Sequence, residues 1–311
     1  MADDVAATLE NVSVAYGTQW ALSEVSTEFP TGAVGLLGPN GAGKSTMLKA
    51  LLGLVKPSGG TMHVLGLDVA SAALKIRERI GYMPENDAQI PGMTAVSFVA
   101  YCGELSGLPA ADAMQRAHEV LYYVGLGEAR YRTVETYSTG MKQRIKLAQA
   151  IVHDPDLLLL DEPTNGMDPK GREEMLALVR DLAHNKNISL ILSSHMMPDV
   201  ESVCASVVVM NRGHVVMRGP IATLKGPAGR MFEVRIKGNQ SAFVEELRSR
   251  SFDCRETDSD LLRVLLPAET DAHELFASAA AVGAQVRHLK PSLPTLEDVF
   301  ARAVRESEEQ G

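Results

Sequence analysis

The sequence predicts an α/β protein in which helices cover a parallel sheet, followed by a smaller α+β module. Three observations support this fold class. Short apolar runs alternate with helical patterns through the first two-thirds of the chain, as in parallel sheets whose strands are joined by helices. From about residue 87 to residue 151 the pattern becomes almost wholly helical. After residue 230 a new alternation of strands and helices begins.

The predicted elements of the first part alternate between strands and helices. They are a strand at Ala33–Leu37, a helix at Lys44–Leu54, strands at Leu157–Leu160 and Ile188–Leu192, and a hairpin of Val207–Met210 and Val215–Met217 around Arg212 and Gly213. The continuous apolar run at Leu157–Leu160 is typical of a strand buried on both faces. The core is expected to carry an antiparallel β subdomain, and residues 87–151 are expected to form a helical subdomain inserted into it.

The second part has its own succession of elements after the turn-rich segment KGPAG, which predicts a linker. The expected elements are a strand from Phe232 to Ile236, a helix at Ser241–Arg250, strands at Phe252–Arg255 and Leu261–Leu266, a helix that begins at a capping box of Asp271 and Glu274, and a strand at Ala284–Leu289. This order matches the ferredoxin-like plan. A last helix is expected to begin at Thr295. We therefore expect two domains, at residues 5–225 and 230–311, the second with an accessory or regulatory role.

Composition is that of a globular protein, with 45% hydrophobic and 22% charged residues. The net charge of −9 counts against a nucleic-acid partner, because proteins bound to phosphate backbones usually carry a basic surplus. No apolar stretch reaches the roughly 20 residues of a membrane helix, and the start MADDVAATLE lacks the apolar core of a signal peptide. The three cysteines are widely spaced and are expected to be reduced thiols. A cytoplasmic location is expected.

The segment GPNGAGKST fits the phosphate-loop pattern G-x-x-x-x-G-K-[ST], between a predicted strand and a predicted helix. Backbone N–H groups of such a loop and the N-terminus of the helix bind phosphates. This predicts a P-loop NTPase core of the RecA-like type, although the motif alone also occurs in kinases, GTPases and helicases. Lys44 is expected to reach the β- and γ-phosphates, and the Ser45 hydroxyl to bind Mg²⁺. The residues expected to contact the nucleotide are Gly38, Pro39, Asn40, Gly41, Ala42, Gly43, Lys44, Ser45 and Thr46.

An acidic pair ends the apolar run LLLLDE. The carboxyl end of that strand is expected beside the phosphate loop. Asp161 is therefore expected to hold Mg²⁺ through water, and Glu162 to polarise the attacking water. The alternative, a surface acidic pair after a core strand, is disfavoured by the phosphate loop upstream and by the segment PTNGMDP that follows.

The segment YSTGMKQR resembles the signature of the ABC ATPases. The family usually has LSGGQ; here Ser138 and Gly140 remain, while Tyr137, Thr139 and Met141 differ. The wording S-x-G-M-K-Q-R is similar to the type-2 exporter branch of ABC transporters, which move drugs, lipids, ions or polysaccharides. The resemblance implies that Ser138 and Gly140 contact the γ-phosphate of ATP bound to a second copy. A helix N-cap at Ser138 or Thr139 is expected as well.

The same resemblance implies roles for three more residues. Asp168, in NGMDP, would contact the opposite protomer's phosphate loop, and His195, in ILSSH, would touch the γ-phosphate and position Glu162. Tyr16, in SVAYGTQW, matches the aromatic residue that stacks on adenine. The nearby Trp20 is expected to serve in packing.

Glu85, in YMPE, lies where the family usually has Gln, although Glu occurs in the type-2 exporters. A carboxylate can ligate Mg²⁺, but it also repels the γ-phosphate. At ~5 Å and an effective dielectric of ~20, this repulsion would be about 3 kcal/mol without the metal. Nucleotide binding is therefore expected to depend strongly on Mg²⁺. The catalytic set is then Glu162, His195 and Glu85, and the metal set is Ser45, Glu85 and Asp161.

The resemblance also implies partners. Each ATP site of the family is split between two ATP-binding subunits. The chain is therefore expected to form a head-to-tail dimer, as a homodimer or with a paralogue, that closes on ATP and reopens after hydrolysis. The segment Asn86–Tyr101 is expected to dock a separate membrane permease at the inner face of the cell membrane and to power export.

Three other functions fit the sequence less well. A soluble ABC ATPase of ribosomes or DNA usually has two ATP modules, coiled-coil insertions or zinc sites, none of which the sequence shows. A non-hydrolysing regulatory module is disfavoured because Glu162 and His195 are both present. A P-loop kinase needs neither YSTGMKQR nor the histidine.

Overall fold

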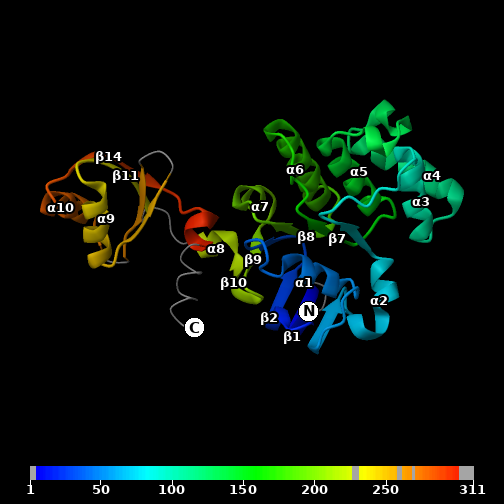
Figure 1. The fold of residues 1–311 in the computed structure, drawn as a ribbon, viewed down its shortest axis with the longest axis horizontal. Coiled ribbons are helices and arrows are strands. Elements are labelled where there is room, and N and C mark those ends of the chain that lie inside the picture. The colour runs from blue at the N-terminus through cyan, green and yellow to red at the C-terminus, as the bar shows by residue number, and fades with distance from the viewer. Residues whose placement is uncertain (1–4, 226–230, 258–260, 268–269, 301–311) are drawn as a thin grey trace. The chain divides into compact units, whose positions relative to one another are not determined.

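The computed structural model describes residues 5–225, 231–257, 261–267 and 270–300. The chain divides into two compact units, Met1–Ile221 and Ala222–Gly311 (Figure 1). Each unit has a hydrophobic core of its own. Within the described ranges, no helix combines the length and the apolar character needed to cross a bilayer.

A six-stranded sheet in the order β10-β9-β3-β8-β7-β6 forms the centre of the first unit. The strands are β3 (Ala33–Leu37), β6 (Ile80–Met83), β7 (Leu157–Asp161), β8 (Ser189–Ser194), β9 (Ser206–Asn211) and β10 (His214–Pro220). All neighbours pair in parallel except β10, which closes one edge as the predicted hairpin with β9. Every residue of β3 and β7 is buried, as expected of apolar strands covered on both faces. The predicted α/β fold class is confirmed.

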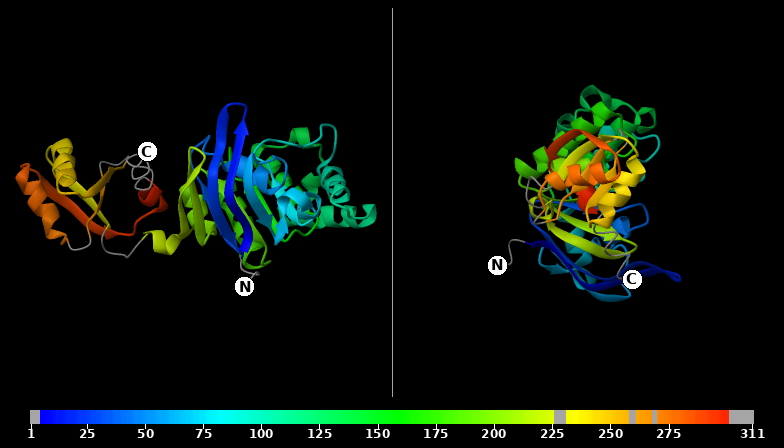
Figure 2. Two further views of the ribbon diagram at one scale, coloured as in Figure 1. Left: turned by 90° about the horizontal axis from the view of Figure 1, so that it is seen from below. Right: turned by 90° about the vertical axis from the view of Figure 1, so that its left-hand side faces the viewer.

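A second, antiparallel sheet has the order β2-β1-β4-β5. Its strands are β1 (Val5–Tyr16), β2 (Gln19–Pro30), β4 (Gly59–Val64) and β5 (Leu67–Asp68). Figure 2 shows β1 and β2 as two long strands that run side by side. Side chains of this sheet, such as Val12, Leu22 and Phe29, share one core with Leu36 and Leu159 of the central sheet. The strands that lead to Tyr16 are thereby fixed to the sheet that carries the phosphate loop.

Helices connect and cover these sheets, and the predicted helical insertion is present. The first group is α1 (Lys44–Leu51), α2 (Val69–Arg77), α6 (Pro169–His184), α7 (Met197–Val203) and α8 (Ile221–Lys225). The insertion holds α3 (Ala95–Leu105), α4 (Ala110–Tyr123), η1 (Gly127–Tyr131), η2 (Val134–Thr136) and α5 (Thr139–Ile151). Helix α1 ends before the predicted Leu54, because Gly53 adopts the left-handed conformation with φ 66° and its N–H bonds back to the Ala50 carbonyl.

The second unit has the predicted ferredoxin-like order of elements. They are β11 (Met231–Lys237), α9 (Gln240–Ser249), β12 (Asp253–Glu256), β13 (Leu262–Leu265), α10 (His273–Ala281) and β14 (Gln285–Ser292). The strands form one antiparallel sheet in the order β12-β13-β11-β14. Phe243 and Leu247 of α9 and Leu275 of α10 pack on inward side chains of the sheet, including Val234 and Val264.

The predicted capping box at Asp271 and Glu274 does not form. The N-cap of α10 is Ala272, and the Asp271 carboxylate instead accepts a hydrogen bond from the His273 N–H at 3.1 Å. Glu274 pairs with Arg250 at 3.1 Å. The nearby guanidinium thus takes the carboxylate that the box would have used, because a charged partner binds it more strongly than a neutral amide.

A capping box does form at Thr295. The Thr295 N–H donates to the Asp298 carboxylate at 2.8 Å, and the Asp298 N–H donates back to the Thr295 hydroxyl at 3.3 Å. Residues 296–300 are helical, with Leu296 and Val299 buried. The predicted start of the last helix is therefore confirmed.

Candidate functional site

The phosphate loop joins β3 to α1 and is held in one conformation by its neighbours. Gly43 caps α1 with φ 104°, and a Cβ there would collide with the Ala21 carbonyl oxygen of β2. Only glycine fits such a position. The buried Lys44 ammonium donates to the carbonyl oxygens of Gly38 at 2.7 Å and Pro39 at 3.2 Å. The lysine is therefore fixed within the curve of its own loop.

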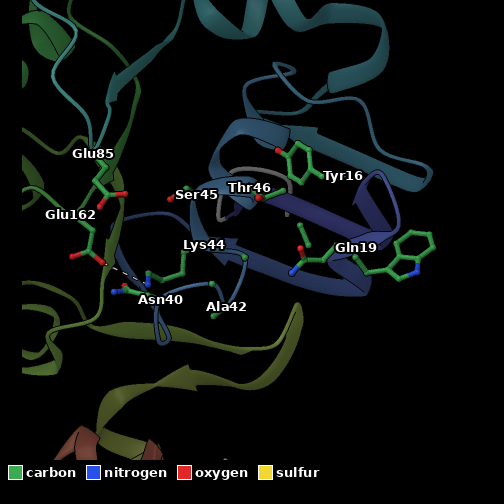
Figure 3. Close-up of a pocket in the computed structure, with 13 residues that line it drawn as sticks. Tyr16, Gln19, Asn40, Ala42, Lys44, Ser45, Thr46, Glu85 and Glu162 are labelled. Carbon is green, nitrogen blue, oxygen red and sulfur yellow. Dashed lines mark ion pairs between the residues drawn. The ribbon is translucent and has the colours of Figure 1, made fainter.

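An open pocket of about 440 Å³ lies over this loop (Figure 3). Its lining residues are Tyr16, Gln19, Trp20, Ala21, Asn40, Gly41, Ala42, Gly43, Lys44, Ser45, Thr46, Glu85 and Glu162. The structure therefore brings Tyr16, most of the phosphate loop, Glu85 and Glu162 to one cavity. Gln19, Trp20 and Ala21 are the additions that the sequence motifs do not include.

Glu162 follows β7 directly and contacts two other candidate residues. Its N–H donates to the Ser193 carbonyl of β8 at 3.0 Å, and its φ of 49° is unusual for a residue with a side chain. Its Oε1 lies 3.6 Å from the Lys44 Nζ, and its Oε2 lies 2.9 Å from Nδ1 of His195, which follows β8. Because β7 and β8 pair in parallel, the two residues meet at one edge of the sheet. His195 can thus orient the Glu162 carboxylate.

Asp161 ends β7 and is almost completely buried. Its Oδ1 has no hydrogen-bond partner in the described structure, which is costly for a buried carboxylate oxygen. Burial raises the pKa of the neighbouring Tyr82 to about 12, and the negative charges of Asp161 and Glu85 add to this effect. Carboxylate charge of Asp161 and Glu85 therefore gathers near Tyr82, and Glu85 lines the pocket together with Ser45.

The three residues implied to act on a second copy lie elsewhere. The Ser138 hydroxyl accepts the Met141 N–H at 3.3 Å, which confirms the predicted N-cap of α5. The Asp168 carboxylate caps α6 by accepting the Gly171 N–H at 2.6 Å. Together with Gly140, they are missing from the described residues that line the pocket. Ser138 and Asp168 thus lie at the N-termini of two different helices, α5 and α6.

Trp20 does not pack in the core as the sequence predicts. The sequence suggested packing, yet its side chain is 57% exposed and lines the pocket. Trp20 pairs with Ala15 near the end of the β1–β2 hairpin, where the strands extend beyond the core. Residue type alone favoured burial, and no local pattern showed that the hairpin end would lie at the pocket.

A buried ionic network behind the site was also missed. Asp199 of α7 is 2% exposed. Its carboxylate accepts hydrogen bonds from Arg172 Nε of α6 at 2.7 Å and from the Thr164 hydroxyl at 2.6 Å. Thr164 lies two residues after Glu162, so the network connects the loop after β7 to two helices. No sequence motif signalled it, because its members are far apart in the chain.

A second missed residue is Lys146 of α5, which is 1% exposed. Its Nζ donates to the carbonyl oxygens of Pro84 at 3.0 Å and Glu85 at 2.7 Å. Burial lowers its pKa. A lysine in the helical pattern IKLAQA suggests a solvent-facing position, so this contact cannot be predicted from the local pattern.

Comparisons with known proteins agree with this geometry. The sequence profile of the family described as ABC transporter matches residues 22–165. The linearmycin resistance ATP-binding protein LnrL of Bacillus subtilis is 34% identical over 94% of this chain and 96% of its own length. The daunorubicin/doxorubicin resistance ATP-binding protein DrrA of Streptomyces peucetius is 33% identical over 93% of this chain and 89% of its own.

Solved structures show the same core. A bacterial ABC transporter cassette in dimeric form matches with a TM-score of 0.64 and 25% identity, over 70% of this chain and 99% of that one. The protein cbiO1 from Clostridium perfringens, part of the transporter complex cbiONQ, matches with a TM-score of 0.63 and 26% identity, over 70% and 89%. The chain therefore belongs to the family of ABC transporter ATP-binding proteins, the subunits that bind and hydrolyse ATP.

Proposed function

We propose that this subunit hydrolyses MgATP at a site completed by a second copy, and that the cycle powers export through a separate membrane permease. One observation carries the proposal: the pocket holds the phosphate loop and Glu162, whereas Ser138 and Asp168 lie at the N-termini of other helices. A single chain therefore presents half of a site in each of two places.

The residues of the pocket fit Mg²⁺ as well as ATP. The metal prefers oxygen ligands. Ser45 and Glu85, which line the pocket, and Asp161, which precedes Glu162, supply only oxygens. The buried, unpartnered Oδ1 of Asp161 is the observation that best fits a bound cation. When bound, the metal would neutralise negative charge on the phosphates. We assign Tyr16 to the adenine, and Lys44 with the loop amides to the phosphates.

Glu162 is the proposed catalytic carboxylate. Its Oε2 accepts a hydrogen bond from His195 Nδ1 when that nitrogen carries the proton, which leaves lone pairs of the carboxylate available to a water molecule. The carboxylate polarises this water for attack on the γ-phosphorus, and ADP and phosphate are released. The left-handed backbone of Glu162 aims the side chain and is the kind of strain found at functional sites.

The second copy supplies the other half of the site. The N-terminus of α5, with Ser138 and Gly140, offers a hydroxyl, backbone N–H groups and a positive dipole end to the γ-phosphate. Asp168 would contact the phosphate loop of its partner. The similarity to a cassette solved as a dimer supports the formation of a dimer.

Mixing two inactive variants tests the split site. Lys44→Ala damages the phosphate-loop half, and Ser138→Arg damages the signature half. A mixed dimer contains one site in which both halves are intact, so ATPase activity should return on mixing. If mixed dimers form, as shown by differently tagged subunits, and activity stays at the level of the separate variants, the shared site is wrong.

A groove of about 340 Å³ beside α3 is the proposed contact for the permease. It contains exposed apolar side chains, including Ile90, Tyr101 and the 70% exposed Leu105. Buried members of the predicted segment, such as Val96 and Val99, belong to the subdomain's own core. We infer a peripheral position at the inner face of the cell membrane. Relatives named for drug resistance support an export role.

Capture from membranes tests this partner. Immobilised Glu162→Gln protein with MgATP is exposed to detergent-solubilised native membranes, and bound proteins are identified by mass spectrometry. A polytopic membrane protein is expected, and it should be lost when Leu105→Asp is added, with ATP binding unchanged. Recovery of ribosomal or DNA-repair proteins without a permease would contradict the transporter role and favour a soluble ATPase.

A further inference from the structure

Helix α5 contacts the loop after β6 along two of its turns. Lys146 donates to the carbonyls of Pro84 and Glu85. One turn earlier, Lys142 pairs with Asp87 at 3.0 Å, and the Lys142 carbonyl accepts a long hydrogen bond of 3.5 Å from Gln89. The loop that carries Glu85 into the ATP pocket is thus bound to the helix that begins at Ser138.

The two lysine contacts differ in their surroundings. The Lys142 side chain is about one-third exposed and meets a half-exposed Asp87, so solvent competes for both charges. The Lys146 side chain is enclosed, and its ammonium uses backbone carbonyls, with Asp87 Oδ1 at 4.0 Å as the nearest carboxylate. A buried ammonium must keep its acceptors. The Lys146 contact therefore determines where the backbone of Glu85 lies.

We propose that Lys146 is a positioning residue that fixes the Glu85 loop to α5, so that the Glu85 carboxylate and the Ser138 end of α5 move as one body. Any shift of Glu85 in the chain's own ATP pocket would then reach the residues offered to the second copy. The inference rests on the proposed role of Glu85 at the metal. Lys146 touches neither nucleotide nor metal and acts only through Glu85.

Removal of the ammonium should loosen the loop before any ligand binds. In Lys146→Met the side chain keeps its length and apolar stem but loses its donors. Backbone amides of residues 84–89 should then exchange hydrogen faster in the nucleotide-free protein, while the amides of β7 keep their protection. Lys142→Met, the matched control on the same helix, should leave exchange near that of the parent protein.

The functional readout is the gain in ATP affinity on adding Mg²⁺, compared with EDTA. Fluorescence of Trp20, the one tryptophan of the chain and part of the pocket lining, can follow binding in both conditions. Displacement of the Glu85 carboxylate should reduce this gain by about tenfold in Lys146→Met, and the metal-free ATP affinity should not fall. Lys146→Gln keeps an N–H donor on a shorter side chain, so its affinity gain with Mg²⁺ should lie between those of Lys146→Met and the parent protein.

A double variant separates positioning from general damage. Once Glu85→Ala has removed the carboxylate, the Lys146 contact has no carboxylate to position. Adding Lys146→Met should then cause no further change, so the double variant should match Glu85→Ala alone. The proposal is wrong if the losses of the two single variants multiply in the double variant. It is also wrong if Lys146→Met loses as much ATP affinity in EDTA as with Mg²⁺. If Mg²⁺ raises ATP affinity normally in Lys146→Met but less in Glu85→Ala, the positioning role of Lys146 is wrong, while the metal role of Glu85 stands. A normal gain in Glu85→Ala would instead refute the metal role of Glu85, and the inference with it.

Discussion

Removing the guanidinium of Arg172 should destabilise the first unit strongly, because it leaves the Asp199 carboxylate buried with one hydroxyl partner. The carboxylate is 2% exposed. Its Oδ1 lies 2.7 Å from Nε and 2.5 Å from Nη2 of Arg172. Breaking a buried pair by deleting one member costs about 3–5 kcal/mol. For a domain of 150–250 residues each kcal/mol lowers the melting temperature by about 2–4 °C, so Arg172→Met should lower it by roughly 6–20 °C.

The chain offers a matched control in the pair of Arg79 and Asp156. Their distance of 2.6 Å is nearly the same, but the side chains are 46% and 54% exposed. Exposed pairs contribute about 0–1 kcal/mol, so Arg79→Met should lower the melting temperature by at most about 4 °C.

Scanning calorimetry can measure both variants. Because the two units can unfold separately, the transition of the first unit is identified by its upward shift with MgATP. Adding Asp199→Asn to Arg172→Met should restore part of the loss, since no buried charge then remains unpaired. Equal shifts for the buried and the exposed pair, or a double variant that is worse than Arg172→Met, would refute this reasoning.

Three further outcomes follow from single contacts. Tyr16→Ala should raise the KM for ATP about tenfold, and Tyr16→Phe should not, because base stacking contributes about 1–3 kcal/mol; equal KM values would contradict the adenine contact. Gly81→Ala should prevent folded protein from accumulating in expression trials, because a Cβ there would overlap the Ala150 carbonyl, whereas Gly59→Ala meets open space and should be neutral. Burial raises the pKa of the Cys102 thiol from 9.0 to about 11. The folded state thus favours the neutral thiol, and this stabilisation is present below pH 9.0 and is lost as the pH rises towards about 11. Cys102→Ala should therefore lose less stability than the parent across that range in denaturant titrations, and parallel curves would be the contrary result.

The parts of the site that the sequence predicted are those whose chemistry is local. The phosphate loop needs its glycines within nine consecutive residues, and Glu162 needs only the apolar strand before it. These contacts are set by backbone conformation over a few residues, so their spacing in the sequence is diagnostic. The same holds for the alternating elements of both units, since burial periodicity is a local property of each strand or helix.

The parts that the sequence missed depend on distant partners. Lys146 reaches a carbonyl 61 positions away, and Arg172 reaches Asp199 across 27 positions. A charged residue in a helical pattern is normally solvent-facing, so only the fold shows that these two are exceptions. The capping box predicted at Asp271 and Glu274 is an error of the opposite kind. Their spacing suits a capping box, but Arg250 provides a better partner for the glutamate.

The most direct test of the central claim is the behaviour of Glu162→Gln with MgATP. The variant keeps the phosphate loop and loses the carboxylate that would polarise water, so turnover should fall by at least about a hundredfold. Light scattering after size exclusion should show a dimer with MgATP and a monomer with MgADP, because only the γ-phosphate joins the two halves of the site. Hydrolysis at the parent rate, or an inactive variant that stays monomeric with MgATP, would contradict the proposed shared site.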